Sequence, residues 1–174
     1  MDPRFPIGPF EMPASLDAAA RGEFLHQLRA APERFRAAIH GLHPAQLDTP
    51  YRAGGWTVRQ VIHHVPDSHA SAYVRFRLAL TEDEPTIKPY NEAAWAELAD
   101  ARTAPVEPSL ALLGALHSRW VALIETLPEA AFSRAYRHPE QGRVTLGVVL
   151  AMYAWHCRHH EAHITALRER MGWK

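Results

Sequence analysis

The sequence has little of what marks a secreted, membrane-bound or nucleic-acid-binding protein. It contains one cysteine, Cys157, which excludes an internal disulfide and is typical of a reducing, cytoplasmic setting. Lysine plus arginine and aspartate plus glutamate number 19 each, so the formal net charge is zero and neither nucleic acid nor a membrane surface is an expected partner. No apolar run approaches the ~18 residues of a membrane span, and residues 1–5 do not begin an export signal. We therefore expect a cytoplasmic protein.

Proline, in contrast, is frequent, and it divides the chain. The 174 residues contain 14 prolines, which concentrate between segments of helical spacing. This length can bury a sizeable core, so we expect a single domain over residues 1–174, with no internal repeat. Four prolines fall in residues 1–14, which we expect to form an extended N-terminal arm.

Apolar residues at helical spacing predict four long helices and no convincing strand. Thr57 and Gln60 match a capping box at the start of the second helix, and Gly172 follows the last one. The expected helices run from the N-cap Ser15 to Leu42, from Thr57 to Leu80, from Ser109 to Leu127 and from Leu146 to Met171. The pattern favours an all-α four-helix bundle.

The connection over residues 81–108 holds four prolines and is too long for a hairpin between neighbouring antiparallel helices. We expect it to be a crossover with a short helical piece around Trp95. If it crosses the bundle, the second and third helices run parallel, and Arg59 lies near Leu110.

Residues 155–163 hold four of the chain's twelve histidines inside the last helix. His156 and His160 are one turn apart and about 40° apart in rotation, so their imidazoles can bind one metal ion. His163 shares their apolar stripe and His159 lies at its edge. Three imidazoles in such a stripe need partners, and a metal is one of them. Hydrogen-bonded core histidines or a solvated histidine-rich face are the alternatives.

A third ligand has to come from another helix, and the second helix offers two candidates. His64 borders the apolar face of that helix, whereas His63 is expected to face outward. His69 is placed on the far flank. The remaining histidines have no partner motif and are expected to be surface or capping residues; they are His26, His40, His43, His117 and His138. A zinc-protease motif is not supported, because the spacing of His160 and His163 is one residue too short.

Many short strings occur here in one order over nearly the whole chain. They are residues 5–8, 47–52, 54–61 (GGWTVRQV), 63–64, 67–69, 75–76, 89–90, 95, 110–113, 138–139, 153–163 and 171–173. In these the chain resembles the DinB/YfiT-like metal-dependent hydrolase family, in particular the group related to bacillithiol transferases. It departs from the family pattern at Pro66, where a small residue is usual.

The resemblance implies a four-helix bundle with up-down-down-up connectivity, in agreement with the long crossover. It implies one metal ion per subunit, Zn²⁺ or alternatively Ni²⁺, bound by His64, His156 and His160, the set that the helix faces favour. It also implies a homodimer. Three histidines leave an open coordination position, which is typical of a catalytic zinc site.

Two chemistries and one non-catalytic role fit such a site. In the first, the metal holds a low-molecular-weight thiol as thiolate, which attacks an electrophile; this S-transfer is what the resemblance favours. In the second, metal-bound water hydrolyses a substrate, a reaction that normally uses a nearby carboxylate. Asp67 is a candidate base, and His163 a candidate for orienting a ligand or contacting substrate. Alternatively, the metal only stabilises a dimeric bundle.

Overall fold

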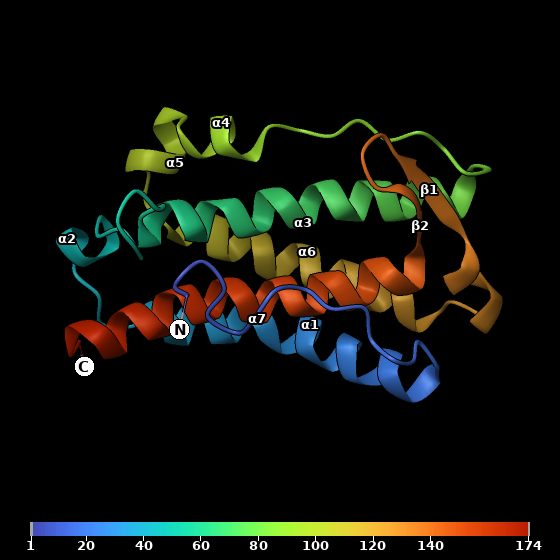
Figure 1. Cartoon of the computed structure of the whole chain (residues 1–174), viewed down its shortest axis with the longest axis horizontal. Helices are drawn as coiled ribbons and strands as arrows, with labels where there is room; N and C mark the ends of the chain where they lie inside the picture. Colours follow the sequence, from blue (N-terminus) through green and yellow to red (C-terminus); the bar gives the residue numbers. More distant parts are fainter. Residues whose placement is uncertain (1, 174) are drawn as a thin grey trace.

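The computed structural model describes residues 2–173. Four long helices lie side by side along its length, and short elements cap them (Figure 1). In chain order the elements are α1 (Ala18–Ile39), α2 (Pro44–Leu47), α3 (Val58–Thr81), α4 (Glu92–Ala96), α5 (Ala99–Thr103), α6 (Glu107–Glu125), the 3-10 helix η1 (Glu129–Ser133), β1 (Ala135–His138), β2 (Gly142–Thr145) and α7 (Leu146–Met171). The predicted four-helix bundle is confirmed.

The directions of the four helices follow from pairs of contacts at two levels along them. His63 of α3 lies 2.7 Å from Ser109 of α6, and further along both helices His69 lies 2.9 Å from His117. The two helices therefore run parallel, as the long crossover predicted. The contacts that fix the other directions are Arg34 with Glu161 and Arg168 with Ala38 for α1 and α7, Arg36 with Leu110 and Leu28 with His117 for α1 and α6, and His64 with His160 and Ser68 with Tyr153 for α3 and α7. The connectivity is up-down-down-up.

The helix ends show where local sequence signals succeed. Thr57 accepts the Gln60 backbone N–H at 3.1 Å while the Gln60 side chain accepts the Thr57 N–H at 2.9 Å, so the predicted capping box is present. Gly172 ends α7 in the left-handed region with φ 66°. At α1 the prediction was wrong, because the N-cap is Asp17 and Ser15 only accepts the Asp17 N–H. The helix α6 begins two residues before the predicted Ser109.

The crossover between α3 and α6 packs on the outer face of α3, where α4 and α5 lie over its first turns (Figure 1). Gln60 donates to the Ala96 carbonyl and Arg59 to the Ala104 carbonyl, both at 2.8 Å. His63 points away from α7 as predicted, but this face is not solvent-exposed. The crossover covers it, so His63 is only 8% exposed and contacts the Ala104 carbonyl.

A two-stranded antiparallel hairpin precedes α7, where the sequence indicated only turns. Ala135 pairs with Thr145 and His138 with Gly142, whose φ of 71° suits the turn. Neither strand exceeds four residues. Such short strands give almost no period-two pattern, which is why the prediction of no strand was wrong.

The N-terminal segment, residues 2–17, contains no helix or strand and lies along α7 (Figure 1). Phe5 lies beside His159 and Phe10 beside Trp155, with ring centroids 6.1 and 5.9 Å apart. The segment therefore covers the part of α7 that carries the histidines.

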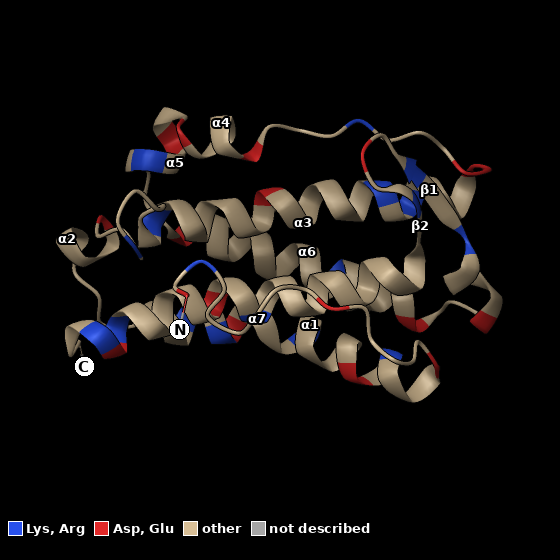
Figure 2. Cartoon of the chain, viewed as in Figure 1, with Lys and Arg blue, Asp and Glu red and all other residues tan. Residues whose placement is uncertain are grey.

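The core lies between the four long helices and includes Trp120, Phe76 and Leu150, each fully buried. Basic and acidic residues are scattered over the four long helices and most of the short elements, and neither sign gathers on one face in the view of Figure 2. Among the described residues, no helix is long and apolar enough to cross a membrane.

Candidate metal centre

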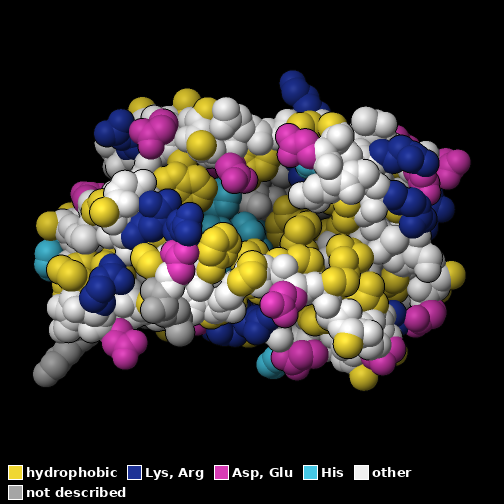
Figure 3. All heavy atoms as spheres, in the orientation of Figure 1, with side chains coloured by type: hydrophobic (Ala, Val, Ile, Leu, Met, Phe, Trp, Pro, Cys, Tyr) yellow, Lys and Arg dark blue, Asp and Glu magenta, His cyan; other side chains and the backbone are white. Residues whose placement is uncertain are grey.

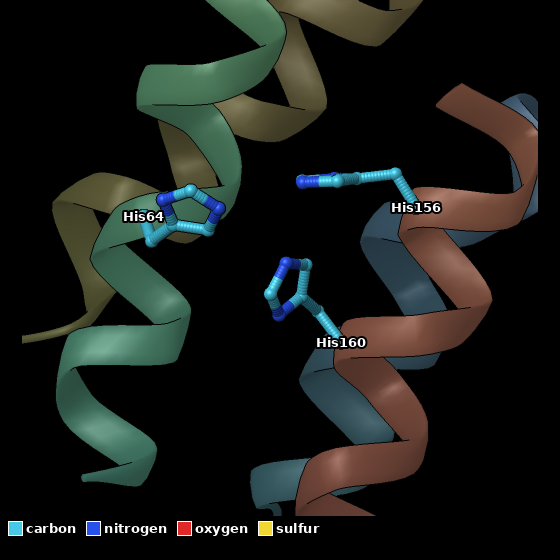
Figure 4. A group of neighbouring side chains, drawn as sticks. All are labelled: His64, His156 and His160. Atoms are coloured by element: carbon cyan, nitrogen blue, oxygen red, sulfur yellow. The ribbon is translucent and has the colours of Figure 1, made fainter. Parts of the chain in front are cut away.

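His64, His156 and His160 come together between α3 and α7, as Figure 4 shows. His64 lies nearly two turns into α3, and at this level α3 faces the middle of α7. The ring centroids are 5.4 Å apart for His64 and His156, 4.8 Å for His64 and His160, and 4.4 Å for His156 and His160. One nitrogen of each ring lies within 4.8 Å of a nitrogen from each of the others. In Figure 4 the three rings converge on one space.

Burial keeps these imidazoles neutral. His64 and His160 are 6% and 7% exposed, and His156 is partly buried. Burial lowers the pKa of His64 to about 4, and repulsion from His159 and His163 acts in the same direction. The pKa of His156 and the pKa of His160 also lie well below the usual value. Burial is the largest cause, and repulsion from the neighbouring histidines is the next. Neutral imidazole is the form that binds a metal, so the site is ready for one at neutral pH.

Within residues 2–173, two other groups of side chains have metal-ligand spacing. One is His159, His160 and His163, and the other is His69, His117 and Cys157. In both, ring nitrogens are already hydrogen-bonded within the group: His160 to His163 at 3.3 Å, and His69 to His117 at 2.9 Å. Burial also raises the pKa of Cys157, which keeps it a thiol. The group of His64, His156 and His160 is therefore the best candidate metal site.

The candidate site opens into a pocket of about 400 Å³. In Figure 3 a hollow near the middle of the molecule shows histidine side chains on its floor. The residues that line the pocket are Arg4, Tyr51, Arg52, Gly54, Gly55, Trp56, His64, Glu92, Trp155, His156, His159, His160 and His163. A second pocket, of about 510 Å³, includes Tyr90, Tyr136 and Tyr153, and it shares His156 and Glu92 with the first. The two pockets therefore meet beside a candidate ligand.

His163 lines the pocket into which the candidate metal site opens, called the metal pocket below. Its Nδ1 is 3.3 Å from Nδ1 of His160, its Nε2 is 3.2 Å from the Arg4 carbonyl, and its ring stacks on Tyr51 at 4.0 Å. Burial lowers the pKa of His163 to about 4, against the effect of the Arg4 carbonyl. His163 is therefore a neutral imidazole held between the N-terminal segment and a candidate ligand.

Asp67 lies elsewhere. It lines a separate pocket on the outer side of α3 together with Trp95 and Lys88, and it does not line the metal pocket. Burial raises the pKa of Asp67, and the neighbouring Asp100 raises it further. The structure therefore does not bring Asp67 together with the three histidines.

Glu92 is the carboxylate that does line the metal pocket, and sequence reasoning missed it. It lies in the first turn of α4, whose N-cap Asn91 accepts the Ala94 N–H at 3.0 Å. A five-residue helix inside the crossover gives no periodic signal that places a side chain against α7. Only Asn91, a typical N-cap followed by an acidic residue, marked the position.

Two histidines were predicted wrongly. His69, expected on the far flank, is completely buried, and His117, expected at the surface or in a cap, is 2% exposed. The Nε2 of His69 lies 3.1 Å from Nδ1 of His156, and His117 Nδ1 lies 2.6 Å from the Leu28 carbonyl. Because α6 runs parallel to α3 at its side, the flank of α3 that carries His69 faces the core. Trp120, a large apolar residue at i+3 from His117 and so on the same side of the helix, was the available signal.

Comparison with known proteins agrees with this geometry, since residues 27–164 match the DinB superfamily. The chain belongs to this superfamily. It is also 49% identical over 172 residues, 99% of both chains, to a protein of Bacillus mycoides strain KBAB4 and to one of Bacillus cereus strain ATCC 14579, each named "Putative metal-dependent hydrolase". The family resemblance found in the sequence is thereby confirmed.

Two solved structures share the fold. YfiT from Bacillus subtilis superposes with a TM-score of 0.97 at 46% identity and full coverage of both chains; it is described as a probable metal-dependent hydrolase with an unusual four-helix bundle topology. TT2238, described as a four-helix bundle protein, has a TM-score of 0.57 at 23% identity, over 86% of this chain and 98% of the other. The second likeness bears on the fold alone.

Proposed function

We propose that His64, His156 and His160 hold one divalent ion, Zn²⁺ or Ni²⁺, and that the protein is a metal-dependent enzyme. The residues present fit such an ion: three neutral imidazoles from two helices converge on one space that opens into a pocket. Three nitrogen ligands and an open position are the arrangement of catalytic zinc sites. Relatives of 49% and 46% identity named or described as metal-dependent hydrolases support the same function.

We further propose S-transfer, in which a low-molecular-weight thiol attacks an electrophile. The observation that carries this reading is the meeting of two pockets at His156 and Glu92, because a transfer needs two substrates side by side. A bound divalent ion would lower the pKa of the thiol and so supply the nucleophile without a general base. The sulfur then bonds to the electrophilic carbon and the leaving group departs with its electron pair.

The lining residues suggest which substrate each pocket accepts. Arg52 and the stacked pair of Tyr51 and His163 line the first pocket, which suits a small thiol with an anionic group. The second is lined by three tyrosines together with Met152 and suits a larger, partly apolar electrophile. Both pockets lie within the size range of small-molecule sites.

Hydrolysis is the second candidate, and Glu92 favours it. Attack by metal-bound water normally uses a nearby carboxylate, and Glu92 is such a carboxylate because it lines both pockets. As a general base, Glu92 would accept a proton from the attacking water. Removing a general base typically lowers the rate by about 10²-fold or more.

Metal analysis tests the site. The purified protein is expected to bind about one divalent ion per chain, and His64→Ala and His156→Ala are each expected to lose it, because two remaining histidines hold an ion weakly. His63→Ala is the matched control: this buried neighbour faces the crossover instead of α7, and occupancy should stay near normal. Full occupancy in His64→Ala or His156→Ala would show that the ligands are different.

A paired assay tests the chemistry. Metal-replete protein is offered several low-molecular-weight thiols with a generic electrophile and, separately, ester and amide substrates. We expect metal-dependent conjugation that exceeds hydrolysis, and only a modest decrease in Asp67→Asn and in Glu92→Gln. Hydrolysis without conjugation, abolished in Glu92→Gln with metal still bound, would replace transfer by the second candidate.

A further inference from the structure

A chain of three hydrogen-bonded histidines, His156, His69 and His117, connects the candidate metal site to the backbone of α1. The Nδ1 of His156 is 3.1 Å from Nε2 of His69, the Nδ1 of His69 is 2.9 Å from Nε2 of His117, and the Nδ1 of His117 is 2.6 Å from the Leu28 carbonyl oxygen. His69 and His117 are 0% and 2% exposed. The chain therefore crosses the core from α7 through α3 and α6 to α1.

The carbonyl at the end of the chain determines every proton position in it. A carbonyl oxygen only accepts hydrogen bonds, so His117 must carry its hydrogen on Nδ1. A neutral imidazole has one N–H, and burial lowers the pKa of His117 to about 4, so its Nε2 is an acceptor. The Nδ1 of His69 must then donate, its Nε2 must accept, and the Nδ1 of His156 must donate to it. The lone pair of His156 is left on Nε2.

Cys157 lies at the same nitrogen of His69, with its Sγ 3.9 Å from Nε2. A thiol can donate a weak hydrogen bond or accept one, so this contact takes its direction from the tautomer of His69. With the hydrogen of His69 on Nδ1, the Cys157 S–H faces the lone pair of Nε2.

His160, the second candidate ligand on α7, is connected in the same way to a backbone carbonyl, but through one histidine instead of two. The Nε2 of His163 is 3.2 Å from the Arg4 carbonyl, which accepts its hydrogen, and so the Nδ1 of His163 accepts from the Nδ1 of His160 at 3.3 Å. His160 is likewise left with its lone pair on Nε2. In Figure 4 His156 and His160 both extend their rings from α7 toward His64.

We propose that His69 and His117 are positioning residues, which hold His156 in the Nδ1–H tautomer so that its Nε2 lone pair faces the metal. The proposal rests on the proposed metal function and adds to it. A metal-binding histidine is oriented by the group that accepts its other N–H. Here that group is itself a histidine, His69, and the Leu28 carbonyl, which lies 89 residues before His117 in the sequence, sets the tautomer of His69 through His117. His117 thus acts on the site without touching it.

The tautomers can be read directly in the metal-free protein. Two-bond ¹H–¹⁵N spectra of protein with ¹⁵N-labelled histidine, recorded at pH 7 with a chelator, distinguish protonated from unprotonated ring nitrogens. We expect His117, His69 and His156 all to carry the hydrogen on Nδ1. A signal that shows His156 protonated on Nε2 would overturn the proposal, whatever the protein catalyses.

Metal affinity gives the second readout, measured by competition with a coloured chelator. His117→Phe removes the acceptor for His69 Nδ1, and we expect the affinity to fall about 10-fold or more although residue 117 does not contact the metal. His117→Gln keeps an acceptor oxygen and should restore most of the affinity. Leu113→Ala, one turn away in the same helix and also buried, is the control for general destabilisation.

The outcomes separate this proposal from the function on which it rests. If His64→Ala and His156→Ala lose the metal while folded His117→Phe binds it like the wild type, the positioning role is wrong and the metal site stands. If His64→Ala and His156→Ala keep the metal, the site itself is wrong, whatever the tautomers are. If His117→Phe does not fold, the wild-type spectra still decide the question.

Discussion

Acidification should unfold the metal-free protein unusually early, because buried neutral histidines must take up protons. The pKa of His64 and the pKa of His117 are each lowered to about 4, mainly by burial. In the unfolded chain a histidine titrates at about 6.5. Between these two values the unfolded state binds more protons than the folded state, so stability is complete above about pH 6.5 and is lost as the pH falls toward about 4.

The size of the effect follows from the same two values. Each group contributes a slope of about 1.4 kcal/mol per pH unit inside the window, so His64 and His117 together give about 2.7. Integrated from neutral pH to pH 5, the free energy of unfolding falls by about 2 kcal/mol for each histidine, or by about 4 kcal/mol for the pair. The pKa values of His69, His156 and His160 are lowered in the same direction and add to the loss. Because domains are stable by about 5–15 kcal/mol, this is a large share.

Urea unfolding followed by circular dichroism, at several pH values between 7 and 5 in the presence of a chelator, measures the slope. His117→Gln removes one titrating group and should lower the slope by about 1.4 kcal/mol per pH unit. His26→Gln changes an exposed histidine and serves as the matched control. The reasoning would be refuted by a free energy of unfolding that stays constant between pH 7 and 5, or by a slope in His117→Gln equal to that of the wild type. Either result would mean that protonation of the buried rings does not destabilise the folded state.

Two further outcomes are expected. Leu150→Ala should destabilise the protein by about 2–5 kcal/mol in urea unfolding, because the side chain is fully buried in the core and truncation leaves a cavity; a loss below 1 kcal/mol would mean that the core collapses around it. The homodimer expected from the family resemblance stays a prediction, and light scattering coupled to size exclusion should give twice the mass of 19.6 kDa, whereas a single chain's mass would contradict it.

The sequence predicted the parts of the fold that depend on local signals and regular spacing. The capping box of Thr57 and Gln60 and the cap at Gly172 are local, and they are present in the structure. The parallel course of α3 and α6 could be inferred because the length of residues 81–108 alone excludes a hairpin. The hairpin of β1 and β2 could not, because its four-residue strands pair with each other and carry no period of their own.

At the candidate site, helical rotation predicted correctly which way the histidines of α3 point, but it did not predict which of them are buried. His64 faces His156 and His160 as expected, and His63 points away from them as expected. Rotation around one helix does not show what covers its other faces. The crossover buries His63 and brings Glu92 into the metal pocket. This packing depends on the tertiary structure, and the periodicity of residues within α3 does not predict it.

The difference between the found and the missed histidines has a common physical cause. His156 and His160 are neighbours on one helix, so their spacing alone indicates a shared ligand. His69 and His117 lie on different helices, and their contact with each other appears only in the tertiary structure. A buried imidazole without a partner is costly, and that cost was the reason to suspect a metal at the cluster of α7. The same reasoning applied to His117, within a stripe of buried apolar residues, would have required a partner for it too. Polar residues inside a predicted apolar stripe are therefore best paired across helices before any of them is assigned to the surface.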